Sequence, residues 1–153
     1  MSSVDVFADI LTRRPLLALV AEDNMINQIV MSKLLEGVGH EVEVVENGQL
    51  ACDILSERRF DFIVMDVHMP ILNGLDATRA IREGGNMIPI IGCTADSFPD
   101  QLEIFRLSGM DDIVVKPVHR ERLLMSINKV MNETIHVQRD GSLIEPVPDI
   151  SFS

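Results

Sequence analysis

Two kinds of apolar pattern alternate along this chain, and their order constrains its fold more than any other feature. Short runs rich in β-branched residues, of the length of buried strands, occur at Leu16–Ala21, Glu41–Val45, Phe62–Met65, Ile88–Cys93 and Ile113–Val115. Longer stretches with helical spacing follow them, at about Met25–Glu36, Gly48–Arg58, Gly74–Glu83, Pro99–Ser108 and Arg120–Met131. This alternation predicts an α/β fold, in which a five-stranded parallel sheet carries helices on both faces.

The predicted strand order and domain boundaries follow from this alternation. Connections between parallel strands are right-handed, and for a (βα)5 unit we expect the flavodoxin-like order 2-1-3-4-5. At 153 residues the chain has the length of one domain, which we place at residues 15–131. We predict an N-terminal extension at residues 1–14 and a flexible C-terminal tail at residues 132–153, which contains Asp140-Gly141 and two prolines.

Charge and composition exclude several classes of protein. The net charge of −11 would repel a phosphate backbone, so we expect no nucleic-acid partner. No apolar run approaches the ~18 residues of a membrane span, and the first residues do not resemble a signal peptide. The two cysteines, Cys52 and Cys93, lie on different predicted elements, which favours reduced thiols. We therefore expect a cytoplasmic protein without membrane insertion.

Charged and hydroxyl side chains follow the central strands of the predicted sheet. Sites in open α/β sheets lie beyond the carboxyl ends of the strands, where the strand order switches. The first and third strands are predicted neighbours, so Glu22, Asp23 and Asp66 should converge. Thr94 follows the fourth strand and Lys116 the fifth. All five side chains should therefore gather at one edge of the sheet.

These residue types together indicate phosphoryl-transfer chemistry. Three carboxylates in one crevice repel each other unless a cation lies among them, and Mg²⁺ or Mn²⁺ prefers such oxygen ligands. A hydroxyl and a mobile ammonium group suit a bound phosphoryl group. A carboxylate can act as the nucleophile. Each residue alone also fits a helix cap, a turn or a solvated surface position, and it is their shared location that favours a site.

Several stretches carry a resemblance to a known family: Val20–Asn24, Met65–Pro70, Asn73–Leu75, Cys93–Ala95 and Gly109–Pro117. In these stretches the chain closely resembles the receiver domains of response regulators in two-component signalling. The resemblance covers about residues 16–131, with the motifs in matching order. The stretches Glu22–Gln28 and Gly74–Arg82 are most similar to receivers of hybrid histidine kinases.

The resemblance implies a role for each residue at the predicted edge. Asp66 matches the phosphoacceptor, which receives a phosphoryl group from a phosphohistidine of a histidine kinase or a histidine phosphotransfer protein. Asp23 matches the direct ligand of Mg²⁺, and Glu22 a second acid that often acts through water. The backbone carbonyl of His68 would complete the protein's share of the metal shell.

The same resemblance extends to the fourth and fifth strands. Thr94 matches the hydroxyl that binds the phosphoryl group, and Lys116 matches its ion-pairing partner. Pro117 stands where the family has a cis peptide bond, which would aim Lys116 into the site. Ile113 departs from the family, which commonly has Tyr or Phe there, so the usual aromatic switch is impossible in this chain.

The first predicted helix offers a docking surface. At ~100° per residue one stripe should face the sheet, and it consists of Val30, Met31, Leu34, Leu35 and Val38. Met25 and Ile29 fall on the outer side, beside the acidic residues. Together with Pro117 and Val118 they predict the surface that a phosphohistidine partner covers. Isolated exposed apolar residues are also common without any function.

Three other interpretations stay open from the sequence. A phosphatase of the haloacid-dehalogenase type would have Asp-x-Asp after its first strand, where this chain has Glu22-Asp23-Asn24, and steady turnover of a phosphate monoester would favour it. A flavin carrier would need a Ser/Thr/Gly-rich phosphate loop there and would be yellow. A degenerate receiver that only binds partners conflicts with the complete set of site residues.

Apart from the site, we expect His40 and His136 on the surface.

Overall fold

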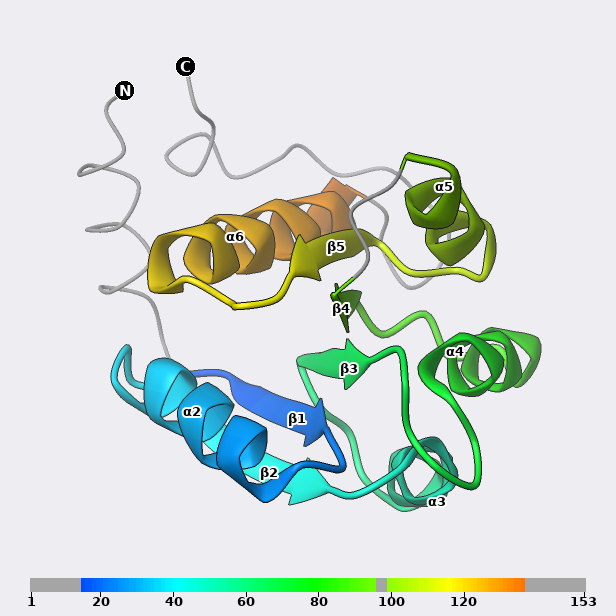
Figure 1. Cartoon of the computed structure of the whole chain (residues 1–153), viewed down its shortest axis with the longest axis horizontal. Helices are drawn as coiled ribbons and strands as arrows, with labels where there is room; N and C mark the ends of the chain where they lie inside the picture. Colours follow the sequence, from blue (N-terminus) through cyan, green and yellow to red (C-terminus); the bar gives the residue numbers. More distant parts are fainter. Residues whose placement is uncertain (1–14, 96–98, 137–153) are drawn as a thin grey trace.

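The computed structural model describes residues 15–95 and 99–136, and it contains the predicted alternating fold (Figure 1). The elements in chain order are β1 (Leu17–Ala21), α2 (Met25–Glu36), β2 (Glu41–Val45), α3 (Gly48–Glu57), β3 (Phe62–Asp66), α4 (Gly74–Glu83), β4 (Ile90–Thr94), α5 (Pro99–Leu107), β5 (Asp112–Val115) and α6 (Arg120–His136). All strand pairs are parallel, in the order β2-β1-β3-β4-β5. The predicted fold class and strand order are confirmed.

Two element boundaries differ from the sequence prediction by more than one residue, and both have identifiable reasons. Strand β4 begins at Ile90 rather than Ile88, because Pro89 has no N–H to contribute to the ladder. Helix α6 continues to His136 rather than ending at Met131, since no glycine or proline follows before Gly141. Residues 1–14 and 137–153, where we predicted an extension and most of a tail, lie outside the described residues.

Three of the helices begin with the same local interaction. In each, the side chain of an asparagine just before the helix accepts a hydrogen bond from a backbone N–H in the first turn, and these residues are Asn24, Asn47 and Asn73. Such caps satisfy donors that have no partner within the helix and stabilise it by about 1 kcal/mol each. They also fix where α2 and α4 begin, directly after the loops that follow β1 and β3.

The core consists of two apolar layers, one on each face of the sheet. Alternate residues of β3 supply both layers: Ile63 and Met65 pack under α3, α4 and α5, whereas Phe62 and Val64 pack under α2 and α6. Figure 1 shows these helices on their respective sides of the sheet. Because side chains alternate along β3, Asp66 falls on the α2 and α6 side.

Helix α2 packs on the sheet through a narrower stripe than predicted. Met31 and Leu35 are buried, and Leu34 is partly buried, as the pattern indicated. Val30 was predicted to face the sheet, but its side chain is 48% exposed, so this assignment was wrong. The reason is a cavity beneath Val30, where α2 and the segment after β5 do not close over the sheet.

His40 is buried rather than exposed, which corrects the sequence prediction. Its Nδ1 accepts a hydrogen bond from the backbone N–H of Leu16 (3.1 Å), and its ring packs edge-on against Phe62. Burial lowers the pKa of His40, and the nearby Asp61 opposes this effect. The neutral imidazole therefore ties the entry of β1 to the segment before β2.

Within the described residues, no helix combines the length and the apolar character that crossing a bilayer requires.

Candidate functional site

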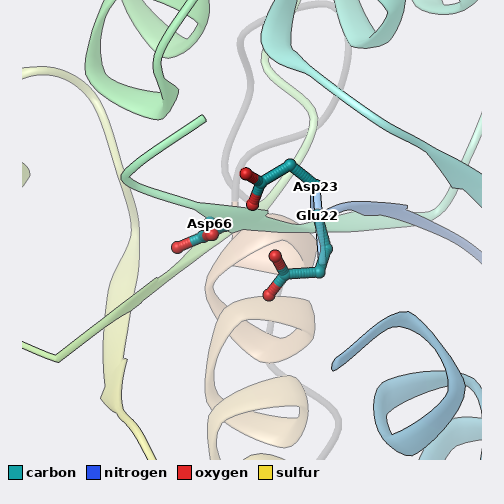
Figure 2. A group of neighbouring side chains, drawn as sticks. All are labelled: Glu22, Asp23 and Asp66. Carbon is teal, nitrogen blue, oxygen red and sulfur yellow. The ribbon is translucent and has the colours of Figure 1, made fainter. Parts of the chain in front are cut away.

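Three carboxylates converge at the carboxyl edge of the sheet, as Figure 2 shows. Glu22 and Asp23 directly follow β1, and Asp66 is the last residue of the neighbouring β3. One oxygen from each of the three lies within 4.8 Å of the others. Glu22 and Asp66 are buried, whereas Asp23 is exposed. The structure thus brings together the three acids that the sequence placed at one edge.

Lys116 is the cation that faces this acidic cluster. Its Nζ lies 3.2 Å from Glu22 Oε1 and 3.2 Å from Asp66 Oδ1. Burial opposes the charge on Lys116, but Asp66 and then Glu22 outweigh it, so the pKa of Lys116 is raised. One ammonium charge beside three carboxylates leaves the cluster negative, and a further cation would relieve their repulsion.

The two acids after β1 differ in how many contacts they already make. Both carboxylate oxygens of Glu22 are engaged, Oε2 by the backbone N–H of Asn24 (3.1 Å) and Oε1 by Lys116. Within the described part of the chain, no hydrogen bond reaches the carboxylate of Asp23. The carboxylate of Asp23 is therefore the less engaged of the two, and the separate metal-binding roles of Asp23 and Glu22 stay a prediction.

A residue that the sequence argument left without a role, Gln28, holds the loop that carries these acids. Its side-chain amide reaches back from α2 and donates to the backbone carbonyl of Glu22 (2.7 Å). The backbone N–H of Glu22 donates to Val45 on β2 (3.0 Å), so the loop is fixed from two sides. The spacing of Gln28, one helical turn after Asn24, was the signal that could have revealed it.

The loop after Asp66 is close-packed and locally strained. A side chain at Gly74 would collide with the backbone carbonyl of Asp66, so glycine allows α4 to start against the end of β3. Ile71 has φ = 71°. On either side of it, the backbone N–H of Leu72 donates to the backbone carbonyl of Pro70 (2.7 Å). This is a γ-turn, a strained geometry for a β-branched residue.

The other predicted site residues lie around Asp66. Thr94 is completely buried at the end of β4, and its backbone carbonyl accepts the N–H of Lys116 (2.7 Å). The Lys116–Pro117 peptide bond is cis. The backbone N–H of His68 lies 3.4 Å from Asp66 Oδ1, and the His68 side chain is exposed. The metal-binding role of the His68 carbonyl stays a prediction.

Ile113, which replaces the family's aromatic residue, is buried against the neighbouring strand. It packs beside Met110 over Gly92 of β4, where a side chain would have no room. Cys93 is also buried beside the site, and burial raises the pKa of its thiol to about 12. The thiol therefore stays protonated at neutral pH and lacks the reactivity of a thiolate.

Three of the four predicted docking residues are exposed. Met25 and Ile29 on α2 are 72% and 49% exposed, and Ile26, which the sequence argument did not single out, is 71% exposed. Pro117 is exposed and Val118 is partly buried. With Val30 these α2 residues form a larger apolar surface than predicted, which we call the α2 patch: Met25, Ile26, Ile29 and Val30.

Comparison with known proteins identifies the family. The family model of the response regulator receiver domain matches residues 18–128. The chain is 40% identical over 139 residues to hybrid signal transduction histidine kinase I of Dictyostelium discoideum. The matched region is 85% of this chain and 8% of the kinase. The chain thus spans a small part of the length of that relative.

Two solved structures are similar to this chain over most of the described region. One is the receiver domain of the sensor histidine kinase PA1611 of Pseudomonas aeruginosa, which has a magnesium ion coordinated in its active-site cleft (TM-score 0.71, 34% identity, 76% of this chain and 98% of that chain). The other belongs to the co-crystal structure of the Saccharomyces cerevisiae histidine phosphotransfer protein Ypd1 with the receiver domain of its response regulator Ssk1 (TM-score 0.71, 28% identity, 76% and 88% coverage).

This chain therefore belongs to the response regulator receiver domain family. It is a phosphoacceptor module of two-component or phosphorelay signalling rather than a conventional enzyme. Histidine kinases and histidine phosphotransfer proteins are the partners of such receiver domains.

Proposed function

We propose that this chain accepts a phosphoryl group onto Asp66 from a phosphohistidine of a histidine kinase or a histidine phosphotransfer protein. The observation that carries the proposal is the composition of the acidic cluster. Asp66 ends the strand beside Glu22 and Asp23, with the ammonium group of Lys116 as their cationic neighbour. A nucleophilic carboxylate, an acidic crevice and an ammonium group are the parts that phosphoryl transfer uses.

The residues present fit a divalent cation, Mg²⁺ or Mn²⁺. Carboxylate oxygens from three residues meet within 4.8 Å, and hard cations prefer oxygen ligands. We assign direct ligation to Asp23 and Asp66, ligation through water to Glu22, and a backbone ligand to the carbonyl of His68. When bound, the ion offsets the negative charge of the carboxylates and of the transferred phosphoryl group.

The chain's own residues then act by position and charge. A carboxylate oxygen of Asp66 forms the new O–P bond, the P–N bond of the donor breaks, and the imidazole leaves with the electron pair. Lys116, already 3.2 Å from Asp66 Oδ1, pairs with the negative oxygens of the transferred group, and Thr94 supplies a hydroxyl donor. Neither residue has to move from another part of the fold, because Thr94 is the last residue of β4 and Lys116 directly follows β5, at the same edge of the sheet.

We further propose that the partner docks on the α2 patch and on the segment with Pro117 and Val118. Val30, Pro117 and Val118 line the cavity that reaches Asp66, and the rest of the α2 patch is exposed on the same helix, so a protein that delivers a phosphoryl group there should cover this surface. Phosphorylation then changes this interaction surface, without the aromatic switch that Ile113 rules out. Both cysteines are free, which supports a reducing compartment and hence the cytoplasm.

The test is phosphoryl transfer from purified, phosphorylated histidine phosphotransfer proteins. We expect at least one donor to transfer its phosphoryl group to the wild-type chain and none to Asp66→Asn, which lacks the nucleophile. In Ile29→Glu, transfer should fall sharply, whereas the matched variant Leu50→Glu, on the opposite face of the sheet, should behave as wild type. Equal transfer to wild type and Asp66→Asn would contradict the proposal.

A further inference from the structure

A cavity of about 230 Å³ lies directly beside Asp66. It opens between α2 and the segment after β5, and Val30 on one side and Val118 on the other form its walls. Val20 of β1 and Val64 of β3 line it from the sheet, and Asp66 and Lys116 line its inner end. The cavity thus joins the α2 patch at the surface to the phosphoacceptor in the interior.

The size and chemistry of the cavity restrict what can occupy it. Its volume is below the ~300–1,000 Å³ of sites that enclose a drug-sized ligand or a cofactor. Glu22, Asp66 and Lys116 make its inner end polar, whereas its outer walls are mainly aliphatic, so a free phosphate or a hydrated ion would lose hydrogen bonds in that outer part. A single apolar side chain fits within this volume and matches the lining of the outer part.

The position of the cavity determines where such a side chain must come from. The donor imidazole has to reach Asp66, and Asp66 itself lines the cavity. Side chains that flank the phosphohistidine on the donor helix therefore pass over the cavity mouth when transfer occurs. Residues three or four positions apart on a helix are neighbours about 5–6 Å apart, so an apolar residue one turn from the histidine can lie over the cavity while the histidine reaches Asp66.

We propose that this cavity receives one apolar side chain of the phosphohistidine-bearing partner, carried on the same partner helix one turn away from the histidine. The inference rests on the proposed function, since it assumes a protein donor. The inserted side chain anchors the donor helix in one register over Asp66. The α2 patch then supplies the surrounding contact surface, and a small buried anchor carries much of the affinity.

The first experiment fills the cavity from its mouth with Val30→Trp and uses Leu50→Trp, at an exposed α3 position, as the matched control. The donor is the phosphorylated histidine phosphotransfer protein that transfers fastest to the wild-type chain. The measured quantity is the rate of transfer from this donor divided by the rate of labelling by acetyl phosphate. This ratio should fall at least ~10-fold in Val30→Trp and stay within ~2-fold of wild type in Leu50→Trp. An unchanged ratio in Val30→Trp would overturn the inference.

The second experiment distinguishes insertion from simple blocking of the surface. Each apolar residue three or four positions from the donor histidine is truncated to alanine in turn. One truncation should slow transfer to the wild-type chain and restore transfer to Val30→Trp, because it removes the group that the tryptophan displaces. If no truncation restores transfer, insertion is wrong while the proposed function stands. If no donor phosphorylates the wild-type chain, the proposed function itself fails.

Discussion

The two ends of β5 each carry a buried charge cluster, and the clusters differ in how completely their charges are matched. At the start of the strand, Asp112 accepts hydrogen bonds from Ser126 Oγ (2.6 Å) and Arg122 Nη1 (3.3 Å), and Lys129 Nζ lies 3.6 Å away. Just past its end, Lys116 meets Glu22 and Asp66 with Asp23 nearby. The first cluster surrounds one acid with donors, whereas the second surrounds one cation with acids.

This difference separates a structural site from a binding site. Burial opposes the charge on Asp112, but hydrogen bonds from Ser126 and Arg122 outweigh it, so the pKa of Asp112 is lowered. Asp112 therefore needs no ligand, and it ties β5 to α6. The cluster at the other end has excess negative charge, which a divalent cation can offset, and its ammonium group can pair with a transferred phosphoryl group. Incomplete charge matching at a buried strand end is thus the feature that indicates function here.

The largest expected effect is the loss of metal binding in Asp23→Ala. Asp23 is the exposed acid whose carboxylate is free to ligate, so its removal should weaken Mg²⁺ binding by on the order of 100-fold. Loss of a residue that only orients a metal ligand costs about 10–100-fold in affinity, and loss of a direct ligand should reach at least the upper end of that range. Glu22→Ala should weaken binding less, because both Glu22 oxygens already have partners. Calorimetric titration with Mg²⁺ measures both. Equal losses in the two variants would remove the distinction between these acids.

Asp112→Ala should destabilise the fold without affecting the site. The variant leaves Ser126 buried without its acceptor and breaks the link between β5 and α6, at a cost of about 2 kcal/mol. Denaturant unfolding measures this cost, and Mg²⁺ affinity should stay that of wild type. Glu121→Ala, which removes an exposed acid from α6, is the matched control and should change stability little. A large fall in Mg²⁺ affinity in Asp112→Ala would show that the two clusters are coupled.

Lys116→Ala should have a smaller effect on metal binding, and of the opposite sign to Asp23→Ala. Lys116 competes with a metal ion for Glu22 and Asp66, so its removal should leave Mg²⁺ affinity intact or strengthen it a few-fold. The same titration decides the sign. A loss of affinity as large as that in Asp23→Ala would mean that Lys116 organises the metal site rather than competing for it.

The smallest effect is the pH dependence that His40 introduces away from both clusters. Because its pKa is lowered in the fold, its contribution to stability is complete above the ordinary value of 6.5 and is lost as the pH falls through the lowered value. His40→Asn keeps an acceptor for the N–H of Leu16 but does not titrate, so its unfolding midpoint should fall less between pH 7 and pH 5. His119→Asn, at an exposed position, should follow wild type. Identical curves for His40→Asn and wild type would refute this role.

The fold and the site were predictable from the sequence to different degrees. The sheet order and the helix layers follow from the alternating pattern, because parallel sheets of this size admit few arrangements. The convergence of Glu22, Asp23 and Asp66 follows from the strand order alone. The helix stripe predicted Met31 and Leu35 correctly but not Val30, since its exposure depends on how α2 packs beside the segment after β5.

Other features depended on contacts between distant parts of the chain. His40 is polar and follows a glycine, which is typical of a surface turn, and only the approach of Leu16 and Phe62 makes it a buried acceptor. Gln28 stands in a recognisable motif, but its bond to the Glu22 carbonyl requires the turn between β1 and α2. Local pattern therefore located the site, and tertiary packing determined which side chains support it.

The most direct test of the account is to incubate the protein with acetyl phosphate and Mg²⁺ and to locate the added phosphoryl group by peptide mass spectrometry. We predict one phosphoryl group per chain, on Asp66, formed slowly, dependent on the divalent cation and absent from Asp66→Asn. Labelling of Asp66→Asn to the wild-type extent, or labelling of the wild type that is unaffected by removal of the metal with EDTA, would contradict the central claim.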